Sequence, residues 1–398
     1  MPTPLSLLNR RSGTRTEGAA RASLPAQTDG GSAAAPRPGR RPRLYALDGM
    51  RLIAALGVLL FHYTGQELDP RVWHGSNKTL LPHVHEIGRY TWMGVELFFL
   101  ISGFVICMSC WGKRPRDFFI SRVIRLYPAY WFCVLLTAAV VWYAARPFGS
   151  FGDLSARTLF SNLSMMQWPI GSPAVDPVYW TLWLEMRFYV AFAIVVAFGL
   201  TYRRVVLFCM IWSFAAIFTP MINFGLATEV TQPVYAPFFI GGIVMYLMYR
   251  FKPTFLLWAM LVFDWMMAQN QLPGIMKQYE SDGNRGLTYT VACLVMTACY
   301  LLVLAAALGK LNWISWKWLT TAGALTYPLY LLHQEIGWVG ISYLRRSLPP
   351  GETLGAMIAI MLVVAYLVNR VVERPLSAKL KTWLESSFKA MAEASDAK

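Results

Sequence analysis

An arginine and a histidine flank an uncharged apolar run at residues 51–62, RLIAALGVLLFH. In an α-helix this spacing places Arg51 and His62 on one face, about 20° apart around the axis and about 16 Å apart along it. Asp48 fits the start of that helix, where free N–H groups favour phosphate. Because ionisable side chains are costly inside a membrane, the pair is a candidate site; alternatively, both side chains only reach the two interfaces.

A basic segment, KRPRDFFISRVIRLYP, follows at residues 113–128. Arg122 and Arg125 are three positions apart and therefore share one face of a helix. Guanidinium groups at that spacing suit phosphate, since each offers a planar fork of donors. The alternative is ordinary positive charge on the cytoplasmic side of a membrane protein.

The stretch DPVYWTLWLEMRFYV carries two charges into an apolar helix. Asp176 is expected to cap this helix and Pro177 to begin it, which puts Glu185 about 13 Å inside. Glu185 and Arg187 are two positions apart and point to different faces, so each needs a partner elsewhere. We expect Glu96 to form an ion pair with Arg187.

A second intramembrane histidine lies in LTYPLYLLHQEIG, which holds Pro328, His333 and Glu335. Pro328 is expected to kink its helix and to free carbonyl groups, which requires protein or a cavity to supply partners. His333 is either a second acid/base group or a core histidine with its hydrogen bonds satisfied.

Two weaker clusters lack the spacing of a metal site. Cys107 and Cys110 form C-x-x-C at the end of an apolar helix without a second ligand pair, which favours packing. The first outer loop gathers several ionisable residues without a tight ligand motif: His74, His83, His85 and Glu86. We therefore expect no metal site, and Asp264 receives no role.

These residues need apolar helices to position them, and the composition supplies such helices. Of 398 residues, 56% are hydrophobic and 14% are charged, which predicts an all-α, polytopic membrane helix bundle. The net charge of +15 records membrane topology rather than nucleic-acid binding. About ten spans are expected, near 46–66, 92–111, 127–145, 178–200, 204–220, 233–250, 253–270, 287–308, 320–343 and 353–372.

The distribution of basic residues predicts the orientation of the bundle. Most Lys and Arg fall in segments that lie inside if both termini are cytoplasmic. Residues 1–43 read as a disordered basic tail without an export signal, residues 44–381 as the membrane domain, and residues 382–398 as a C-terminal tail. We expect no appended soluble domain, because the loops are short.

Six motifs, taken in order, resemble the acyltransferase 3 family of integral membrane acyltransferases. They are LDGMRLIAALGVLLFH, GVELFFLISGFVI, FFISRVIRLYP, VYWTLWLEMRFYV, LTYPLYLLH and VNRVVERPLSAKL, and they cover residues 44–381. The resemblance implies a bundle of about ten helices in a bacterial inner membrane. It also implies that the protein takes an acyl group, most often acetyl, from cytosolic acyl-coenzyme A. The acceptor would be a hydroxyl of a carbohydrate such as a surface or exported polysaccharide or its lipid-linked precursor.

The resemblance also implies roles for individual residues. Arg51 and His62 match the first-helix motif, and Arg122 and Arg125 match the RxxR. Glu185 matches the family's intramembrane glutamate, and His333 matches its late histidine. The extracytoplasmic hydrolase-like domain that some relatives carry is not expected here. Expected partners are acyl-coenzyme A as co-substrate, the carbohydrate acceptor, the lipid bilayer and polysaccharide assembly proteins, with no permanently bound cofactor.

We expect the arginines to hold the coenzyme phosphates and the thioester to reach His62. His62 then acts either as general base on the acceptor hydroxyl or as a transient acyl carrier, with Glu185 orienting its ring. Two alternatives from other classes stay open at this point. A transporter would use the same ionisable groups as a solute path, and a scaffold in a polysaccharide assembly would not need His62.

Overall fold

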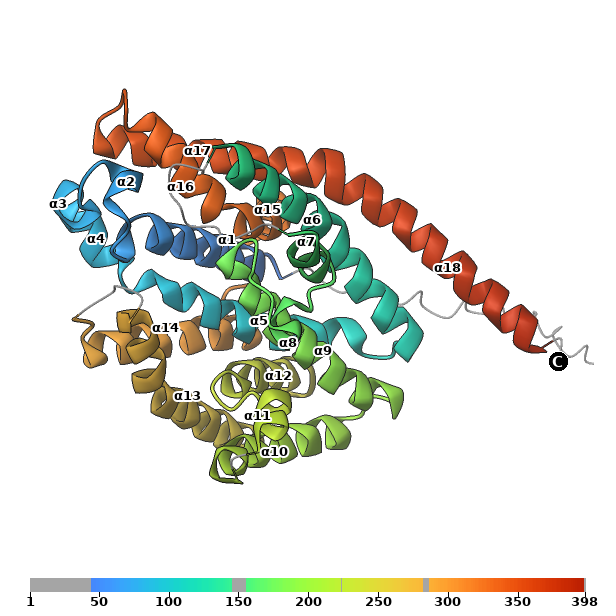
Figure 1. Ribbon diagram of the computed structural model, residues 1–398. Coiled ribbons are helices and arrows are strands. Elements are labelled where there is room, and N and C mark those ends of the chain that lie inside the picture. The colour runs from blue at the N-terminus through green and yellow to red at the C-terminus, as the bar shows by residue number, and fades with distance from the viewer. Residues whose placement is uncertain (1–43, 145–154, 223, 282–285, 397–398) are drawn as a thin grey trace, which may run out of the picture. The chain divides into compact units, whose positions relative to one another are not determined.

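The computed structural model describes residues 44–144, 155–222, 224–281 and 286–396, and these ranges form helices without strands (Figure 1). This confirms the all-α fold class. The elements are α1 (Tyr45–Leu60), η1 (Phe61–Gly65), α2 (Pro70–Trp73), α3 (Asn77–Leu80), α4 (Pro82–Gly88), η2 (Thr91–Met93), α5 (Gly94–Cys110), α6 (Pro115–Ala144), α7 (Ala156–Leu163), α8 (Gln167–Ile170), η4 (Pro177–Tyr179), α9 (Trp180–Ala197), α10 (Tyr202–Phe218), η5 (Thr219–Ile222), α11 (Gly225–Thr231), α12 (Ala236–Phe251), α13 (Phe255–Ser281), α14 (Tyr289–Ala307), α15 (Trp318–Leu332), α16 (Glu335–Leu344), α17 (Pro350–Leu367), η6 (Val368–Glu373) and α18 (Arg374–Asp396).

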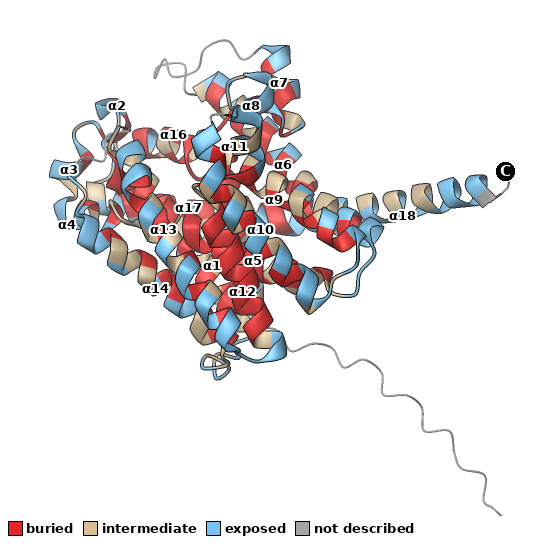
Figure 2. Ribbon diagram, turned by 90° about the horizontal axis from the view of Figure 1, so that it is seen from below, coloured by how far each residue is buried: buried red, intermediate tan, exposed pale blue. Residues whose placement is uncertain are grey.

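Helices α1, α5 and α12 form the buried centre of the bundle (Figure 2). Helix α12 packs against α5 at a distance that only glycine permits. A Cβ added at Gly242 would lie 2.0 Å from the carbonyl oxygen of Leu100. Because this backbone contact has no room for a side chain, it fixes the register of the two helices.

Eight helical stretches of the described chain are long and apolar enough to cross a membrane. The protein is therefore a multi-pass membrane protein, as predicted. The other two expected spans, 253–270 and 320–343, are helical but differ from that expectation. Helix α13 continues into a polar second half that lowers its hydropathy, and 320–343 is divided into α15 and α16, of 15 and 10 residues.

Two prolines inside helices leave carbonyl groups that the C-terminal segment satisfies. Pro128 in α6 removes the N–H that would bind the Ile124 carbonyl, and the Ser377 hydroxyl donates to that carbonyl at 2.9 Å. Pro328 in α15 has the same effect on the Ala324 carbonyl, to which the Asn369 amide donates at 3.4 Å. The freed carbonyls expected at Pro328 therefore have protein partners.

A buried aspartate of α13 contacts two other helices, α12 and α14. Asp264 of α13 accepts a hydrogen bond from the Tyr300 hydroxyl of α14 at 3.1 Å, and it packs against Gly241 of α12, where an added Cβ would lie 2.6 Å from Asp264 Oδ2. Asp264, for which the sequence indicated no role, therefore packs as a hydrogen-bonded structural group.

One long helix crosses the domain boundary that the sequence predicts near the C-terminus. Helix α18 spans Arg374–Asp396 and packs on α6, where Phe388 lies 6.4 Å from Phe119 between ring centroids. The boundary expected at residue 381 therefore lies within a continuous helix. The expected tail at residues 1–43 lies outside the described residues.

Candidate active site

His62 lies where α1 changes into a π-helical turn, η1. The helix ends at Gly65, so its last carbonyl groups have no partner within the helix, and residues of the following segment satisfy them. The Trp73 indole donates to the Tyr63 carbonyl at 2.9 Å, and the Asn77 amide and His85 Nδ1 contact the Thr64 carbonyl at 3.0 and 2.7 Å. His85 thus holds the turn that carries His62.

The structure brings His62 and His333 together, although 270 residues separate them in the chain. Their ring centroids are 5.1 Å apart with an interplanar angle of 53°. Two further contacts hold His62: its carbonyl accepts from the Trp338 indole at 2.8 Å, and its Nδ1 lies 3.4 Å from the Gln66 amide. His62 lines the cavity described below, and His333 lies behind it.

The hydrogen bonds of His333 define its tautomer. Its Nδ1 lies 2.8 Å from the Tyr330 carbonyl, which can only accept, so Nδ1 carries a proton. In the neutral ring, Nε2 then holds a lone pair, and this buried atom has no hydrogen-bond partner in the described part of the chain. Within the described residues, His333 therefore presents an unpartnered acceptor nitrogen in the interior beside His62.

The break between α15 and α16 fixes the position of His333. The Tyr63 hydroxyl donates to the His333 carbonyl at 2.9 Å, and the Tyr179 hydroxyl donates to the Leu331 carbonyl at 3.3 Å. Helix α16 approaches Tyr63 so closely that a Cβ at Gly337 would lie 2.2 Å from the Tyr63 hydroxyl. The π-turn of α1 and the α15–α16 break therefore position each other.

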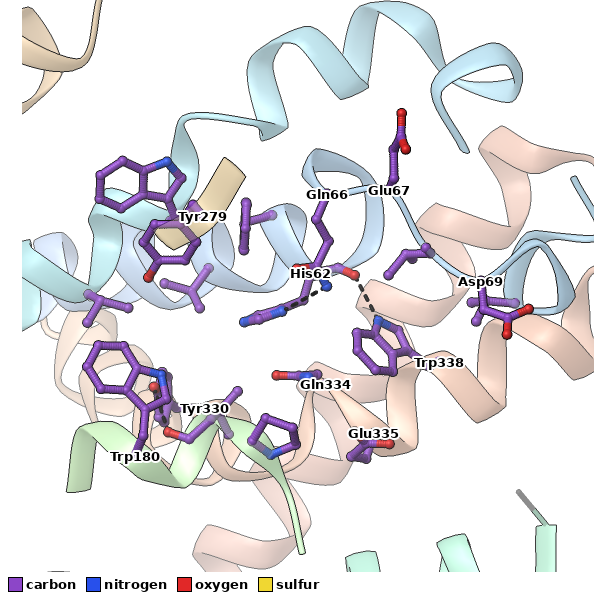
Figure 3. A pocket seen from close by; sticks show the side chains of 18 of the residues that line it. His62, Gln66, Glu67, Asp69, Trp180, Tyr279, Tyr330, Gln334, Glu335 and Trp338 are labelled. Carbon is purple, nitrogen blue, oxygen red and sulfur yellow. Dashed lines mark hydrogen bonds between the residues drawn. The ribbon is translucent and has the colours of Figure 1, made fainter. Parts of the chain in front are cut away.

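A cavity of about 490 Å³ opens beside His62 (Figure 3). Its size falls in the range of small-molecule sites. Aromatic rings form much of the wall, together with amides and carboxylates: Trp92, Trp180, Tyr279, Tyr330, Trp338, Gln66, Gln278, Gln334, Glu67, Asp69 and Glu335. Such a wall suits a ligand with both apolar faces and hydrogen-bonding groups.

The three predicted arginines lie near one another, away from the cavity lining. Arg51 interacts electrostatically with Arg125 and with Glu185. Arg125 forms an ion pair with Glu373 at 2.8 Å, and Glu373 also accepts from the Asn369 amide at 2.8 Å. This group of Arg51, Arg122 and Arg125 is called the arginine cluster below.

Arg122 differs from Arg125 in its contacts. Its guanidinium carbon lies 5.6 Å from the Tyr189 ring centroid and 5.9 Å from that of Phe118, and its Nε donates to the Ser121 hydroxyl at 3.3 Å. No carboxylate forms a salt bridge with Arg122 within the described ranges. Arg122 is therefore the member of the RxxR with the most donor capacity left for a phosphate.

Glu185 belongs with the arginine cluster and not with the His62 ring. Its carboxylate accepts from the Ser102 hydroxyl at 2.8 Å and from the Tyr189 hydroxyl at 2.5 Å. The contacts that orient His62 come instead from Gln66 and Trp338. The expectation that Glu185 orients the ring thus differs from the contacts of this structure, because Glu185 lies on the side of α9 that faces Ser102.

The predicted ion pair between Glu96 and Arg187 is wrong. Arg187 pairs with the Glu229 carboxylate and also donates to the Glu229 carbonyl at 2.7 Å. Glu96 is fully buried, and neither carboxylate oxygen has a hydrogen-bond partner among the described residues. The short helix α11 brings Glu229 to Arg187, a contact that helix periodicity could not indicate.

Among the residues that the sequence reasoning missed, three contact His62 or lie near it in the cavity wall. Gln66 lies four positions after His62, a spacing that could have indicated it. Gln334 follows His333 directly, whereas Trp338 reaches His62 across 276 residues and left no local signal. No group of three potential metal ligands occurs within the described residues.

A comparison with protein families matches residues 44–370 to the acyltransferase domain family Acyl_transf_3. The match covers most of the chain and includes the π-turn histidine, the arginine cluster and His333. The protein belongs to this family.

Curated relatives match over shorter stretches. Acyltransferase MdmB of Streptomyces mycarofaciens is 30% identical over 162 residues, 39% of this chain and 40% of MdmB. O-acetyltransferase OatA of Staphylococcus aureus is 27% identical over 170 residues, 39% of this chain and 25% of OatA. Exopolysaccharide production protein ExoZ of Rhizobium meliloti is 32% identical over 130 residues, 31% of this chain and 38% of ExoZ. The chain thus spans less than half of these relatives, and no solved structure matched significantly.

Proposed function

We propose that this protein transfers an acyl group, in the first instance acetyl, from cytosolic acyl-coenzyme A to a hydroxyl of a carbohydrate. The observation that carries this proposal is the position of His62 on the wall of a ligand-sized cavity, backed by His333. The names of OatA, an O-acetyltransferase, and ExoZ, an exopolysaccharide production protein, support the reaction and the acceptor class.

The acyl donor enters this scheme through the arginine cluster. Three guanidinium groups near the start of α1 and in the first half of α6 offer donors to the phosphates of the coenzyme. Arg51 and His62 are about 16 Å apart along α1, a length that the flexible arm of acyl-coenzyme A can bridge. We propose Arg122 as the main phosphate ligand, since Arg125 already pairs with Glu373.

The reaction needs a group that takes a proton from the acceptor hydroxyl. In the direct route, His62 accepts that proton while the oxygen attacks the thioester carbonyl; the carbon–sulfur bond breaks, and the departing thiolate receives the proton. In the alternative route, a neutral His62 nitrogen attacks the thioester carbonyl and the coenzyme thiolate departs; the acceptor hydroxyl then attacks the acyl-imidazole, the imidazole leaves, and the hydroxyl proton goes to the thiolate. In both, His333 acts through His62 as a positioning residue.

We also propose a bacterial inner membrane location with the arginine cluster on the cytoplasmic side. Polysaccharide assembly proteins are the partners that this role would require. The direction of transfer would then be from the cytosol to an acceptor that enters the cavity from the outer face.

The test uses the purified protein in lipid nanodiscs with radiolabelled acetyl-coenzyme A and an envelope glycan fraction. We expect thiol release that depends on the glycan and label that moves to the glycan. Thiol release without any labelled glycan, or no release at all, would refute the proposal. Intact mass measured without acceptor separates the two routes, because only an acyl carrier gains the mass of the acyl group.

A further inference from the structure

We propose that the acceptor sugar unit bears no negative charge and is selected by Gln334 together with the carboxylates of the cavity wall. This inference rests on the proposed function and adds the substrate class. It starts from the charges around the cavity. Its described lining contains three carboxylates, Glu67, Asp69 and Glu335, and neither lysine nor arginine.

One arginine beside the lining, Arg71, is already paired with a carboxylate. Arg71 binds the carboxylate of Asp69 through its Nε and a terminal nitrogen, at 2.5–3.0 Å. Arg71 thereby neutralises Asp69 at the rim, and this pairing lowers the pKa of Asp69. Glu67 is exposed and forms no salt bridge within the described residues, so the rim keeps a negative charge.

The start of α16 is a feature of the wall that would attract an anion. Free N–H groups at a helix N-terminus favour negative charge. Here the chain supplies its own acceptor: the buried Asp176 accepts from the Glu335 N–H through Oδ2 at 3.4 Å and from the Val178 N–H through Oδ1 at 3.1 Å. Because Asp176 already accepts from the Glu335 N–H, this helix start has no free N–H at Glu335 to offer to a ligand carboxylate or phosphate.

Gln334 supplies a hydrogen-bond acceptor that would attract a hydroxyl group of the acceptor sugar. Its side chain lines the cavity across from His62 (Figure 3), and the residue is only 4% exposed. Its amide oxygen is buried and has no hydrogen-bond partner in the described chain. A buried acceptor without a donor is costly, so a ligand that donates a hydrogen bond gains affinity there. A sugar hydroxyl supplies that donor, whereas a carboxylate or phosphate oxygen does not.

The aromatic wall completes the site for a ring with apolar C–H faces. Trp180 and Trp338 line the cavity on two sides of the space between His62 and Gln334 (Figure 3). Indole faces pack against such ring surfaces while hydroxyl groups reach the amides. A neutral or amino-bearing sugar satisfies the wall, whereas the carboxylate of a uronic acid or the phosphate of a sugar phosphate finds no lysine or arginine among the described lining residues.

The first test identifies the sugar unit that carries the acyl group. Glycans from a deletion strain and from the strain complemented with the full chain are hydrolysed mildly and analysed by tandem mass spectrometry. We expect the added acyl group on a unit without carboxylate or phosphate. An acyl group on a uronic acid or phosphorylated unit overturns this inference and leaves the proposed function intact; no acylated glycan in either strain overturns the proposed function itself.

The second test examines Gln334 in nanodiscs with acetyl-coenzyme A and the glycan fraction of the deletion strain. We expect Gln334→Leu to raise KM for the glycan about tenfold and to leave KM for acetyl-coenzyme A unchanged. Gln334→Glu, which keeps an acceptor oxygen, restores much of the glycan affinity. The matched control is Gln269→Leu in α13, outside the cavity lining. An unchanged glycan KM in Gln334→Leu, or equal losses in both leucine variants, overturns the role of Gln334.

Discussion

At the scale of single residues, the site consists of two histidines with unequal positions. His62 lines the cavity and can touch a substrate, whereas His333 lies behind it with Nδ1 fixed by a backbone carbonyl. The fixed tautomer means that His333 presents only Nε2 to its surroundings. His62 is therefore proposed as the catalytic residue and His333 as its positioning residue.

Replacing His62 tests the catalytic assignment. We expect His62→Ala to lower kcat about 10²- to 10⁴-fold, because no other imidazole lines the cavity within the described residues. The measurement is acceptor-dependent thiol release, with insertion checked by size-exclusion chromatography. The control is His83→Ala on the exposed face of α4; wild-type turnover by a folded His62→Ala protein would refute the assignment.

Replacing His333 tests whether it acts through His62. We expect His333→Gln to lower kcat about tenfold or more and to alter the pH profile of kcat, because a neighbouring imidazole influences the charge on His62. KM for acetyl-coenzyme A should stay unchanged. A loss of activity with an unchanged pH profile would assign His333 a purely structural role.

At the scale of elements, the site depends on two irregular helix ends that meet. Helix α1 ends in the π-turn η1, and α15 breaks before α16; Tyr63 links them through the His333 carbonyl. The C-terminal segment makes a similar link on the other side, where Asn369 and Ser377 satisfy carbonyls freed by two prolines. These links make the positions of His62, His333 and Arg125 interdependent.

The close approach of α16 to Tyr63 gives an element-scale prediction. We expect Gly337→Ala to lower stability by about 1–3 kcal/mol and to reduce turnover, because the new Cβ would overlap the Tyr63 hydroxyl. Thermal unfolding in detergent and thiol release are the measurements. Gly355→Ala in α17 is the matched control, since its Cβ meets no atom within 4 Å; equal behaviour of the two variants would contradict the prediction.

The ion pair between Arg125 of α6 and Glu373 of η6 gives a second prediction at the scale of elements. We expect Arg125→Ala and Glu373→Ala each to destabilise the protein, and the double variant to lose less than the sum, because each single change leaves a partly buried charge unpaired. Arg122→Ala should instead mainly raise KM for acetyl-coenzyme A. A double-mutant cycle of melting temperatures measures the coupling between Arg125 and Glu373, and KM values for acetyl-coenzyme A measure the effect of Arg122→Ala. Additive losses of stability in the Arg125/Glu373 cycle would refute the coupling.

At the scale of the whole molecule, the proposed reaction requires that the arginine cluster and the cavity lie toward opposite membrane faces. The arginines lie near the start of α1 and η6, whereas the cavity adjoins the end of α1 and its following loop. The cysteines in the described ranges are unpaired and mostly buried, so introduced cysteines report accessibility well.

Orientation can be measured directly. In intact cells, we expect a membrane-impermeant maleimide to label Ser76→Cys, in the loop before α3, and not Lys381→Cys in α18 until the cells are opened. The physical reason is the excess of basic residues on the expected cytoplasmic side. Labelling of both sites in intact cells, or the reverse pattern, would refute the proposed orientation.

The sequence by itself determined the helical membrane class, the helix cap at Asp176 and the need for partners around Pro328. These follow from hydropathy and local backbone chemistry, which a short stretch of chain contains. Periodicity also placed Arg122 and Arg125 on one helix face.

Only the tertiary structure decided which of these groups meet. In the structure, the His62 ring lies next to the His333 ring, and Arg187 pairs with Glu229 instead of Glu96. Glu185 lies with the arginine cluster. Such pairings depend on helix rotation and on breaks such as η1, which arise from packing between segments far apart in the chain. Hydropathy is similar on all sides of these helices, so the sequence carried no periodic signal for the choice.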